Sequence, residues 1–190
     1  MIDEAKIRQG IALMLAGLGI DGQGTEETPR RVAMMYREIF SGVDQDPATA
    51  LGSHFNEETD GLVIVRDIPF YSMCEHHLVP FFGKAHIAYL PQNGIIAGFG
   101  RLAAVVEIFA RRPQLQERLT REVAELLMEN LGAAGVMVVV EAEHMCVSMR
   151  GVNKTGVRAV TTVSRGTLAD DALRRAEAAA LLRPTKGNDN

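Results

Sequence analysis

The four residues from Cys74 to His77 read Cys-Glu-His-His, and they concentrate groups that bind metals or transfer protons. The chain has two cysteines and five histidines, so this tetrapeptide holds half of the cysteines and two of the histidines. Thiolate and imidazole are ligands that zinc accepts in tetrahedral geometry. Residues three apart can point the same way in a turn or a first helical coil. Cys74 and His77 are therefore candidate metal ligands, although a Cys-x-x-His pair alone is a weak signal.

The second cysteine lies in another segment rich in polar groups, residues 144–150. The pattern of this segment predicts a strand, in which alternate side chains point to opposite faces. One face would carry His144, Cys146, Ser148 and Arg150. The other face would carry Met145, Val147 and Met149, which we expect in the core. The simpler alternative is that Cys146 is a small buried hydrophobe and His144 a surface residue. With Cys74 and His77, Cys146 would make a three-ligand set that leaves zinc one open position, as in catalytic sites.

Other residues have types suited to proton transfer or to an anionic ring compound. His76 and His144 are imidazoles beside the candidate ligands, suited to proton transfer near neutral pH. Gln116 and Glu117 offer an amide and a carboxylate to the N–H groups of a ring such as guanine. An acidic residue in a first helical turn, however, more commonly complements the helix dipole. Guanidinium groups match phosphate oxygens, and the candidate phosphate contacts are Arg31, Arg101 and Arg150. Each arginine alone is more simply explained as solvated surface.

The hydrophobic pattern predicts the elements that must position these residues. Apolar spacings of three and four predict helices over residues 3–18, 28–42, 101–112, 113–132 and 168–183. Residues rich in β-branched and aromatic side chains predict strands over 62–73, 84–91, 136–151 and 157–166. The polar stretch 43–61 is expected to be a linker or a long loop, and Pro80–Gly83 a break between strands. Thr28 is the candidate N-cap of the second helix.

The order of these elements indicates an α+β fold. Two helices come first, followed by a ββααββ unit and a terminal helix. Helices on one face of an antiparallel sheet are typical of α+β domains. We therefore expect an N-terminal helical region at 1–60, a domain carrying the candidate site at 61–166, and a C-terminal helix with a polar tail at 167–190.

Composition excludes several classes of function. The net charge of the 190 residues is −4, so no overall basic field favours DNA or RNA. No apolar run reaches the roughly 18 residues of a membrane span, and the charged first residues are unlike a signal peptide. Two cysteines in a reducing compartment are more consistent with thiols or metal ligands than with a disulfide. A cytoplasmic protein that binds neither nucleic acid nor membrane is the expectation.

The motifs together resemble the GTP cyclohydrolase I family. The resemblance rests on CEHH followed by LVPFFGKAHIAYLP, then RRPQLQERLT, then EAEHMCVSMRG, and it extends from about residue 28 to residue 166. It implies the tunnelling fold, in which ββααββ units assemble into a barrel, and a decameric homo-oligomer with sites at subunit interfaces. It also implies hydrolytic opening of the guanine ring of GTP at C8, with release of formate and formation of 7,8-dihydroneopterin triphosphate for pterin and folate synthesis.

The resemblance carries roles to individual residues. It implies that Zn²⁺ is held by Cys74, His77 and Cys146. It implies acid–base roles for His76 and His144. The positions that match those holding the guanine edge are Gln116 and Glu117. The positions that match phosphate contacts are Arg31, Arg101 and Arg150.

The chain departs from the family pattern at one phosphate-binding segment. Relatives usually read Gly-Leu-Ser-Lys-x-x-Arg where residues 98–104 read GFGRLAA. Gly100 lacks the hydroxyl and Ala104 lacks the arginine, while Arg101 keeps the charge of the lysine. One missing charged hydrogen bond weakens binding by roughly ten- to a hundredfold.

Three hypotheses about function follow from the sequence. GTP is the substrate in the first. The second is a paralogue that acts on a less phosphorylated guanine compound or stops at the ring-opened product. The third is a non-catalytic tunnelling-fold protein that binds a purine or pterin around a structural zinc. The two histidines beyond the ligand set, His76 and His144, argue against the third, because a structural site would close the fourth position.

Overall fold

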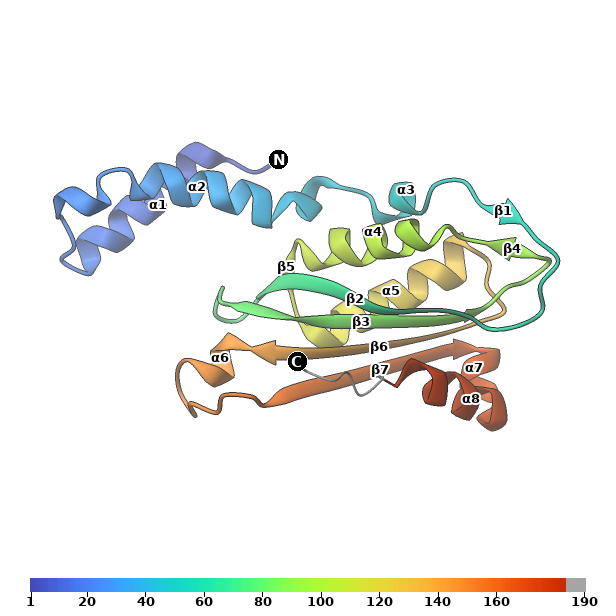
Figure 1. The fold of residues 1–190 in the computed structure, drawn as a ribbon. Coiled ribbons are helices and arrows are strands. Elements are labelled where there is room, and N and C mark those ends of the chain that lie inside the picture. Colours follow the sequence, from blue (N-terminus) through green and yellow to red (C-terminus); the bar gives the residue numbers. More distant parts are fainter. Residues whose placement is uncertain (184–190) are drawn as a thin grey trace, which may run out of the picture.

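A five-stranded sheet forms the centre of the computed structural model, which describes residues 1–183 (Figure 1). Its strands are β2 (Val63–Cys74), β3 (Pro80–Leu90), β5 (Pro113–Gln114), β6 (Gly135–His144) and β7 (Arg158–Gly166). The strand order is β5-β2-β3-β6-β7, with β5 parallel to β2 and every other neighbouring pair antiparallel. The predicted α+β fold and its ββααββ order are confirmed.

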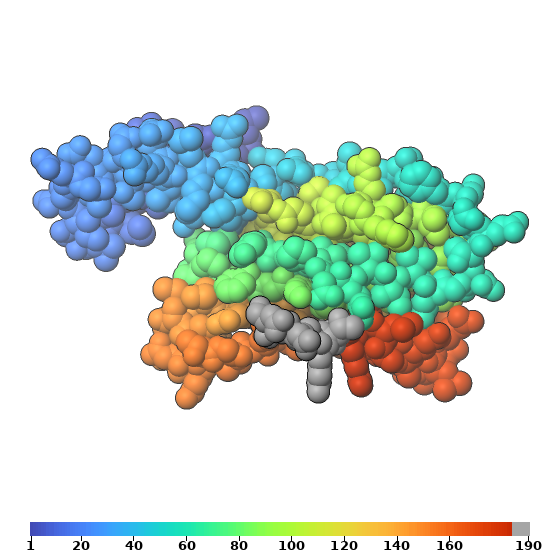
Figure 2. All heavy atoms as spheres, viewed as in Figure 1, coloured from blue at the N-terminus to red at the C-terminus, as the bar shows by residue number. Residues whose placement is uncertain are grey.

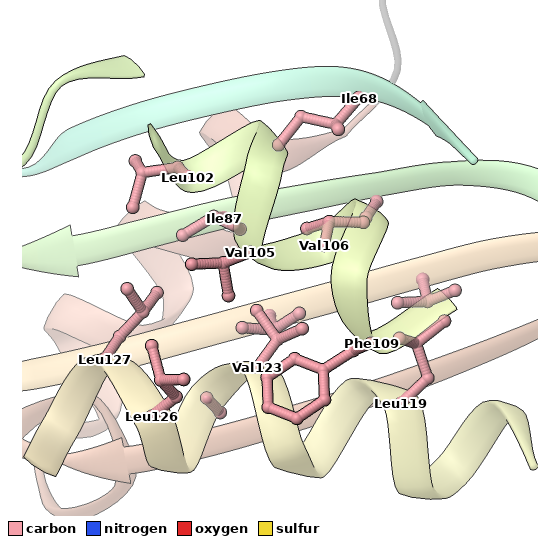
Figure 3. Close-up of a cluster of buried hydrophobic side chains, with 14 of the residues drawn as sticks. Ile68, Ile87, Leu102, Val105, Val106, Phe109, Leu119, Val123, Leu126 and Leu127 are labelled. Carbon is pink, nitrogen blue, oxygen red and sulfur yellow. The ribbon is translucent and has the colours of Figure 1, made fainter. Parts of the chain in front are cut away.

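Two helices cover one face of the sheet and bury most of the core (Figures 1 and 3). They are α4 (Phe99–Ala110) and α5 (Gln116–Asn130). Each carries an apolar stripe spaced by three and four residues, which points at the strands. The buried side chains that meet there include Ile68, Ile87, Leu102, Val105, Phe109, Leu119, Val123 and Leu127. Burial of each such side chain stabilises the fold by about 1.5–3 kcal/mol.

The opposite face of the sheet is covered at one end by the C-terminal helices. Instead of the single predicted helix, the chain forms α7 (Thr167–Asp170) and α8 (Ala172–Leu182). Asp171 separates them because its carboxylate accepts hydrogen bonds from the first backbone N–H groups of α8. A small second core, which includes Ala88, Leu168 and Leu182, lies under these helices. The polar tail predicted at 184–190 lies outside the described residues.

The N-terminal helical pair lies to one side of the sheet, as Figure 2 shows. Helices α1 (Glu4–Gly17) and α2 (Thr28–Ile39) pack against each other, joined by the 3-10 turn η1 (Gln23–Thr25). Glu27, one residue before the predicted Thr28, occupies the N-cap position of α2. Of the two helices, only Ile11 and Ala33 are buried. Leu13 is 73% exposed, so the pair leaves apolar side chains uncovered.

The expectation of a linker over residues 43–61 is wrong. This stretch contains the second half of the 3-10 turn η2 (Ser41–Asp44), helix α3 (Pro47–Leu51) and strand β1 (Phe55–Asn56), which pairs with β4 (Ile95–Ile96). Asp46 caps α3 by accepting a hydrogen bond from Ala48 N, and Pro47 follows at the first helical position. Leu51 is buried in the main core. The polar composition of the stretch favoured a loop, so the sequence did not predict this short capped helix.

Two predicted element boundaries are also wrong. Residues 80–83 continue strand β3 rather than interrupt it, because they pair with both β2 and β6. Pro113 does not begin a helix; with Gln114 it forms β5 beside the end of β2, and α5 begins at Gln116. No helix within residues 1–183 is long and apolar enough to cross a membrane.

A β-bulge in β2 gives His86 a buried structural role. His86 follows Lys84 by two residues on β3 and is only 1% exposed. Asp67 has a φ of 60°, and the β2–β3 register shifts around it. Its N–H donates to His86 Nδ1 at 3.2 Å, and its carboxylate accepts from Lys84 Nζ at 3.0 Å. A neutral His86 ring is therefore part of the bulge.

We expect protonation of His86 to destabilise the fold. Burial lowers the pKa of His86 below its ordinary value of 6.5, and the charges that face it are Asp67, Glu141, Lys84 and Arg66. Above pH 6.5 the ring is neutral in both the folded and the unfolded chain. As the pH falls below that value, the unfolded chain binds the proton first, so the free energy of unfolding decreases. Chemical denaturation at several pH values should show a steeper decrease for the wild type than for His86→Gln, and equal slopes would contradict the assignment.

Candidate functional site

The Cys-Glu-His-His segment forms a tight turn between β2 and β3. Cys74 is the last residue of β2 and is buried. Its carbonyl oxygen accepts hydrogen bonds from His77 N at 3.4 Å and Leu78 N at 2.8 Å. Leu78 closes the turn with a φ of 49°. This geometry brings the His77 side chain back towards Cys74, as the three-residue spacing predicts.

The segment that carries Cys146 is a helical turn, so the predicted strand over 144–150 is wrong. Strand β6 ends at His144, and α6 spans Met145–Ser148. The Ser148 hydroxyl donates to the Glu143 carboxylate at 2.8 Å, which stabilises this turn. Ser148 is buried while Met149 is 59% exposed, so the core predicted for Met149 is also wrong. Strand alternation failed here because the chain changes period directly after His144.

The three predicted ligands nevertheless converge. The Sγ atoms of Cys74 and Cys146 and a ring nitrogen of His77 all lie within 4.8 Å of one another. Two sulfurs and one imidazole nitrogen form a donor set suited to a soft divalent metal ion. Tetrahedral zinc, with bonds of about 2.0–2.3 Å, holds its ligand atoms about 3.3–3.8 Å apart. A modest contraction of this cluster would therefore fit such an ion.

The electrostatics of the cluster make metal binding dependent on pH. Burial raises the pKa of the Cys146 thiol, the neighbouring Cys74 sulfur raises it further, and the positive charge of Arg150 opposes both effects. A metal ion bound here would take the Cys146 thiolate as its ligand, so binding would displace the proton of that thiol. The affinity of the cluster for a metal should accordingly rise with pH.

A buried hydrogen-bond network holds His144 beside the cluster. His144 Nε2 lies 2.7 Å from Gln116 Oε1, and the His144 ring stacks on Phe81 with centroids 4.7 Å apart. Because a carboxamide oxygen only accepts, His144 Nε2 carries the proton in this pair. Gln116 Nε2 lies within hydrogen-bond distance of three acceptors: Val140 O, Ala159 O and Thr161 Oγ1. Gln116 is 3% exposed, so its side chain is fully engaged within the protein.

One charged group, the carboxylate of Glu117, acts on the ring of His144. Burial lowers the pKa of His144, and the carboxylate of Glu117 opposes that shift. Glu117 is exposed in the first turn of α5, directly after the buried Gln116. Its carboxylate is therefore free to meet a ligand near His144. His76 is exposed next to His77, with ring centroids 6.3 Å apart.

One of the predicted phosphate contacts, Arg101, lies away from the cluster. Arg101 is at the beginning of α4 beside Gly52, whereas the far end of α4 contacts Ser72 through the Ala110 carbonyl. Helix rise places these two ends of α4 about 14 Å apart. Arg31 is exposed on α2 in the N-terminal pair. Arg150 lies close to the cluster.

Sequence reasoning missed several residues that support the site. Phe81, which stacks on His144, belongs to the stretch interpreted as a break between strands. The Oγ1 atoms of Thr161 and Thr120 lie 2.6 Å apart, and Thr161 Oγ1 also accepts a hydrogen bond from Gln116 Nε2. The two threonines are distant in sequence, so no local pattern indicated their pairing. Glu75 pairs with Arg118, and Arg118 holds the pKa of the Glu75 carboxyl below its usual range. The only available signal was an acidic residue between predicted ligands.

The chain is similar to proteins of one family over most of its length. The family model of GTP cyclohydrolase I matches residues 6–183. GTP cyclohydrolase 1 of Halalkalibacterium halodurans is 53% identical over 184 residues, covering 96% of this chain and 98% of the relative. GTP cyclohydrolase 1 of Carboxydothermus hydrogenoformans is 52% identical, with 96% of each chain covered. A solved structure of the archaeosine synthase QueF-Like in the apo form aligns over 57% of this chain and 97% of its own, with a TM-score of 0.48 and 17% identity. The extent and identity of the family and sequence matches show that the chain belongs to the GTP cyclohydrolase I family.

Proposed function

We propose that the protein is a hydrolase that opens the imidazole ring of GTP at C8, releases formate and forms 7,8-dihydroneopterin triphosphate for pterin and folate biosynthesis. The observation that carries the proposal is the convergence of Cys74, His77 and Cys146 within 4.8 Å, beside His144. These residues come from β2, its following turn, β6 and α6 in a chain of the GTP cyclohydrolase I family. The two free thiols suit a reducing compartment, which favours the cytoplasm.

Zn²⁺ is the metal that suits this site best. Its ligands would be Cys74, His77 and Cys146, which provide thiolates and imidazole and leave a fourth position for water or substrate. When bound, zinc supplies a Lewis acid that makes water a competent nucleophile near neutral pH. The Cys146 thiol would give up its proton on binding.

The surrounding side chains would hold the substrate and move protons. Glu117 would accept hydrogen bonds from the N–H groups of the guanine edge, a contact that also rejects adenine. His144, fixed by Gln116 and stacked on Phe81, would exchange protons with the purine ring, and His76 would exchange protons with solvent and the ribose. Arg150 would contact the phosphates.

Gln116 would act through His144 rather than through its own side chain. The contacts around its amide leave no free donor, because three acceptors surround Nε2 and His144 Nε2 contacts Oε1. We expect Gln116→Leu to lower kcat about tenfold while KM for GTP changes less than threefold, since one hydrogen bond that orients His144 is lost. Steady-state kinetics measure both, with Gln92→Leu, in a distant turn, as the control. A rise in KM at unchanged kcat would instead indicate direct contact with guanine.

Arg31 and Arg101 would reach the triphosphate of a neighbouring subunit. Arg101 lies at the end of α4 away from the Cys-His-Cys cluster of its own chain, and Arg31 is exposed on the N-terminal pair. Their predicted role therefore calls for a homo-oligomer, a decamer by the family resemblance. Mixing an inactive Cys146→Ser chain with an Arg101→Ala chain tests this arrangement. Recovery of activity in mixed oligomers would support a shared site, and a purely monomeric protein in analytical ultracentrifugation would contradict it.

A second candidate substrate is a less phosphorylated guanine compound. The observation that favours it is the loss of polar groups at Gly100 and Ala104, which leaves Arg101 as the cation of that segment. The structure around Gly100 has room for a side chain, so the missing hydroxyl is not compensated by packing. If GTP is the substrate, kcat/KM should decrease from GTP to GDP to GMP. A flat or inverted order would instead identify the less phosphorylated compound.

The direct test is turnover of GTP by the zinc-loaded protein. We expect equal amounts of formate and a dihydropterin, detected by a coupled formate assay and by absorbance, and no turnover after chelation. Zinc bound at one per chain without turnover of any guanine compound would support the non-catalytic alternative.

A further inference from the structure

Glu75 lies between the ligand Cys74 and the two histidines, and its side chain leaves the turn in another direction. Its carboxylate forms an ion pair with the Arg118 guanidinium. Arg118 is the third residue of α5, directly after Gln116 and Glu117. The pair therefore joins the histidine-bearing turn to the helical turn that positions His144.

The turn has few other attachments through side chains. Within residues 1–183, Glu75 is the one member of the stretch 75–78 whose side chain makes a hydrogen bond or ion pair. The backbone of the stretch contributes Glu75 N, which donates to Gln114 O at 3.0 Å, and two bonds back to Cys74. His76 and His77 are both exposed. The location of the His77 ring thus depends on how firmly Glu75 is held.

A second acidic residue, Glu122, lies near Arg118 on the same helix. Glu122 lies one helical turn after Arg118, and its charge acts on the Arg118 guanidinium. The Glu122 carboxylate accepts a hydrogen bond from Gln114 Nε2 at 2.9 Å. Gln114 is buried and pairs with Cys74 across β5 and β2. Gln114 therefore links Glu122, one helical turn from Arg118, to the strand that carries Cys74.

We infer that Glu75 and Arg118 are positioning residues that set the location of His76 and His77 relative to Cys74 and to the first turn of α5. An exposed ion pair contributes little to stability, so the role of this pair is geometric. Mutation of residues that orient metal ligands without binding the metal typically lowers metal affinity or activity by about 10- to 100-fold. The inference rests on the proposed metal site and hydrolytic function.

The test compares Glu75→Gln, Arg118→Gln, Arg118→Lys and the double variant Glu75→Gln/Arg118→Gln. Arg121→Gln is the matched control, because Arg121 pairs with Glu125 on the same helix, away from the turn. Co²⁺ titration followed by the thiolate charge-transfer absorption gives the metal affinity. Steady-state kinetics with GTP give kcat and KM, and thermal unfolding checks that each variant is folded.

We expect Glu75→Gln and Arg118→Gln each to weaken Co²⁺ binding and to lower kcat by about tenfold, with KM changed less than threefold. The double variant should be no worse than either single variant, because both remove the same pair. Arg118→Lys should restore most of the affinity, and Arg121→Gln should match the wild type. Wild-type affinity and kcat in both single variants would overturn the positioning role. Failure of the wild type itself to bind Co²⁺ would overturn the proposed function instead.

Discussion

Replacement of Cys146 with serine should remove the metal and lower GTP turnover at least about a thousandfold. A serine hydroxyl stays protonated near neutral pH and is a poor ligand for a soft ion, so the three-donor set becomes a two-donor set. Loss of the ion removes the group that makes water nucleophilic. Of all components of the site, we expect this group to contribute most to the rate of GTP turnover. Zinc content by atomic absorption and formate release together measure the effect.

The control for Cys146→Ser is Met149→Ser. Met149 directly follows the same helical turn, and it is 59% exposed, so a hydroxyl there adds polarity without touching the donors. We expect this variant to keep one zinc per chain and wild-type kcat. Full zinc occupancy together with turnover in Cys146→Ser would show that Cys146 is not a ligand.

Replacement of His144 with asparagine should lower kcat by about 10²–10⁴-fold while zinc stays bound. His144 lies outside the cluster of Cys74, His77 and Cys146, so the ligand atoms remain. The loss comes from the imidazole that Gln116 and Phe81 hold in one orientation, a group that asparagine cannot replace in proton transfer. Rapid-quench measurement of a single turnover separates this chemical step from product release.

His54→Asn is the matched control for the histidine replacement. His54 Nε2 contacts the Asn130 carbonyl at the end of α5, the opposite end from Gln116. We expect wild-type kcat in this variant. A change of less than about threefold in kcat for His144→Asn would show that His144 does not transfer protons in the reaction.

The Cys-His-Cys cluster could be predicted from the sequence because its chemistry depends on residue type and short spacing. Cys74 and His77 lie in one turn, and Cys146 is the only other cysteine. The main helices and strands could also be predicted, since α4 and α5 carry clear stripes of Leu, Val and Phe. These are local patterns that burial against a sheet preserves.

The details that position the site depend on tertiary contacts and could not be predicted. The turn to a helix after His144 is set by the Ser148–Glu143 hydrogen bond, against a local pattern that favours a strand. The burial of His86 follows from a bulge at Asp67 in another strand. Such pairings join residues far apart in sequence, and residue type alone does not identify the partner.

The separation of Arg101 from the Cys-His-Cys cluster could not be predicted from the sequence either. Its motif predicts a phosphate contact, but the motif does not say which copy of the chain supplies the phosphate. Only the position of Arg101 beside Gly52, at the beginning of α4, raises that question.

X-ray absorption spectroscopy at the zinc edge of the zinc-loaded protein tests the central claim most directly. We predict two sulfur scatterers at about 2.3 Å and two nitrogen or oxygen scatterers at about 2.0–2.1 Å, one of them exchangeable with solvent or substrate. The Cys146→Ser protein should lose one sulfur or the metal itself. A first shell without sulfur, or one filled by four protein ligands in the wild type, would contradict a catalytic site built on Cys74, His77 and Cys146.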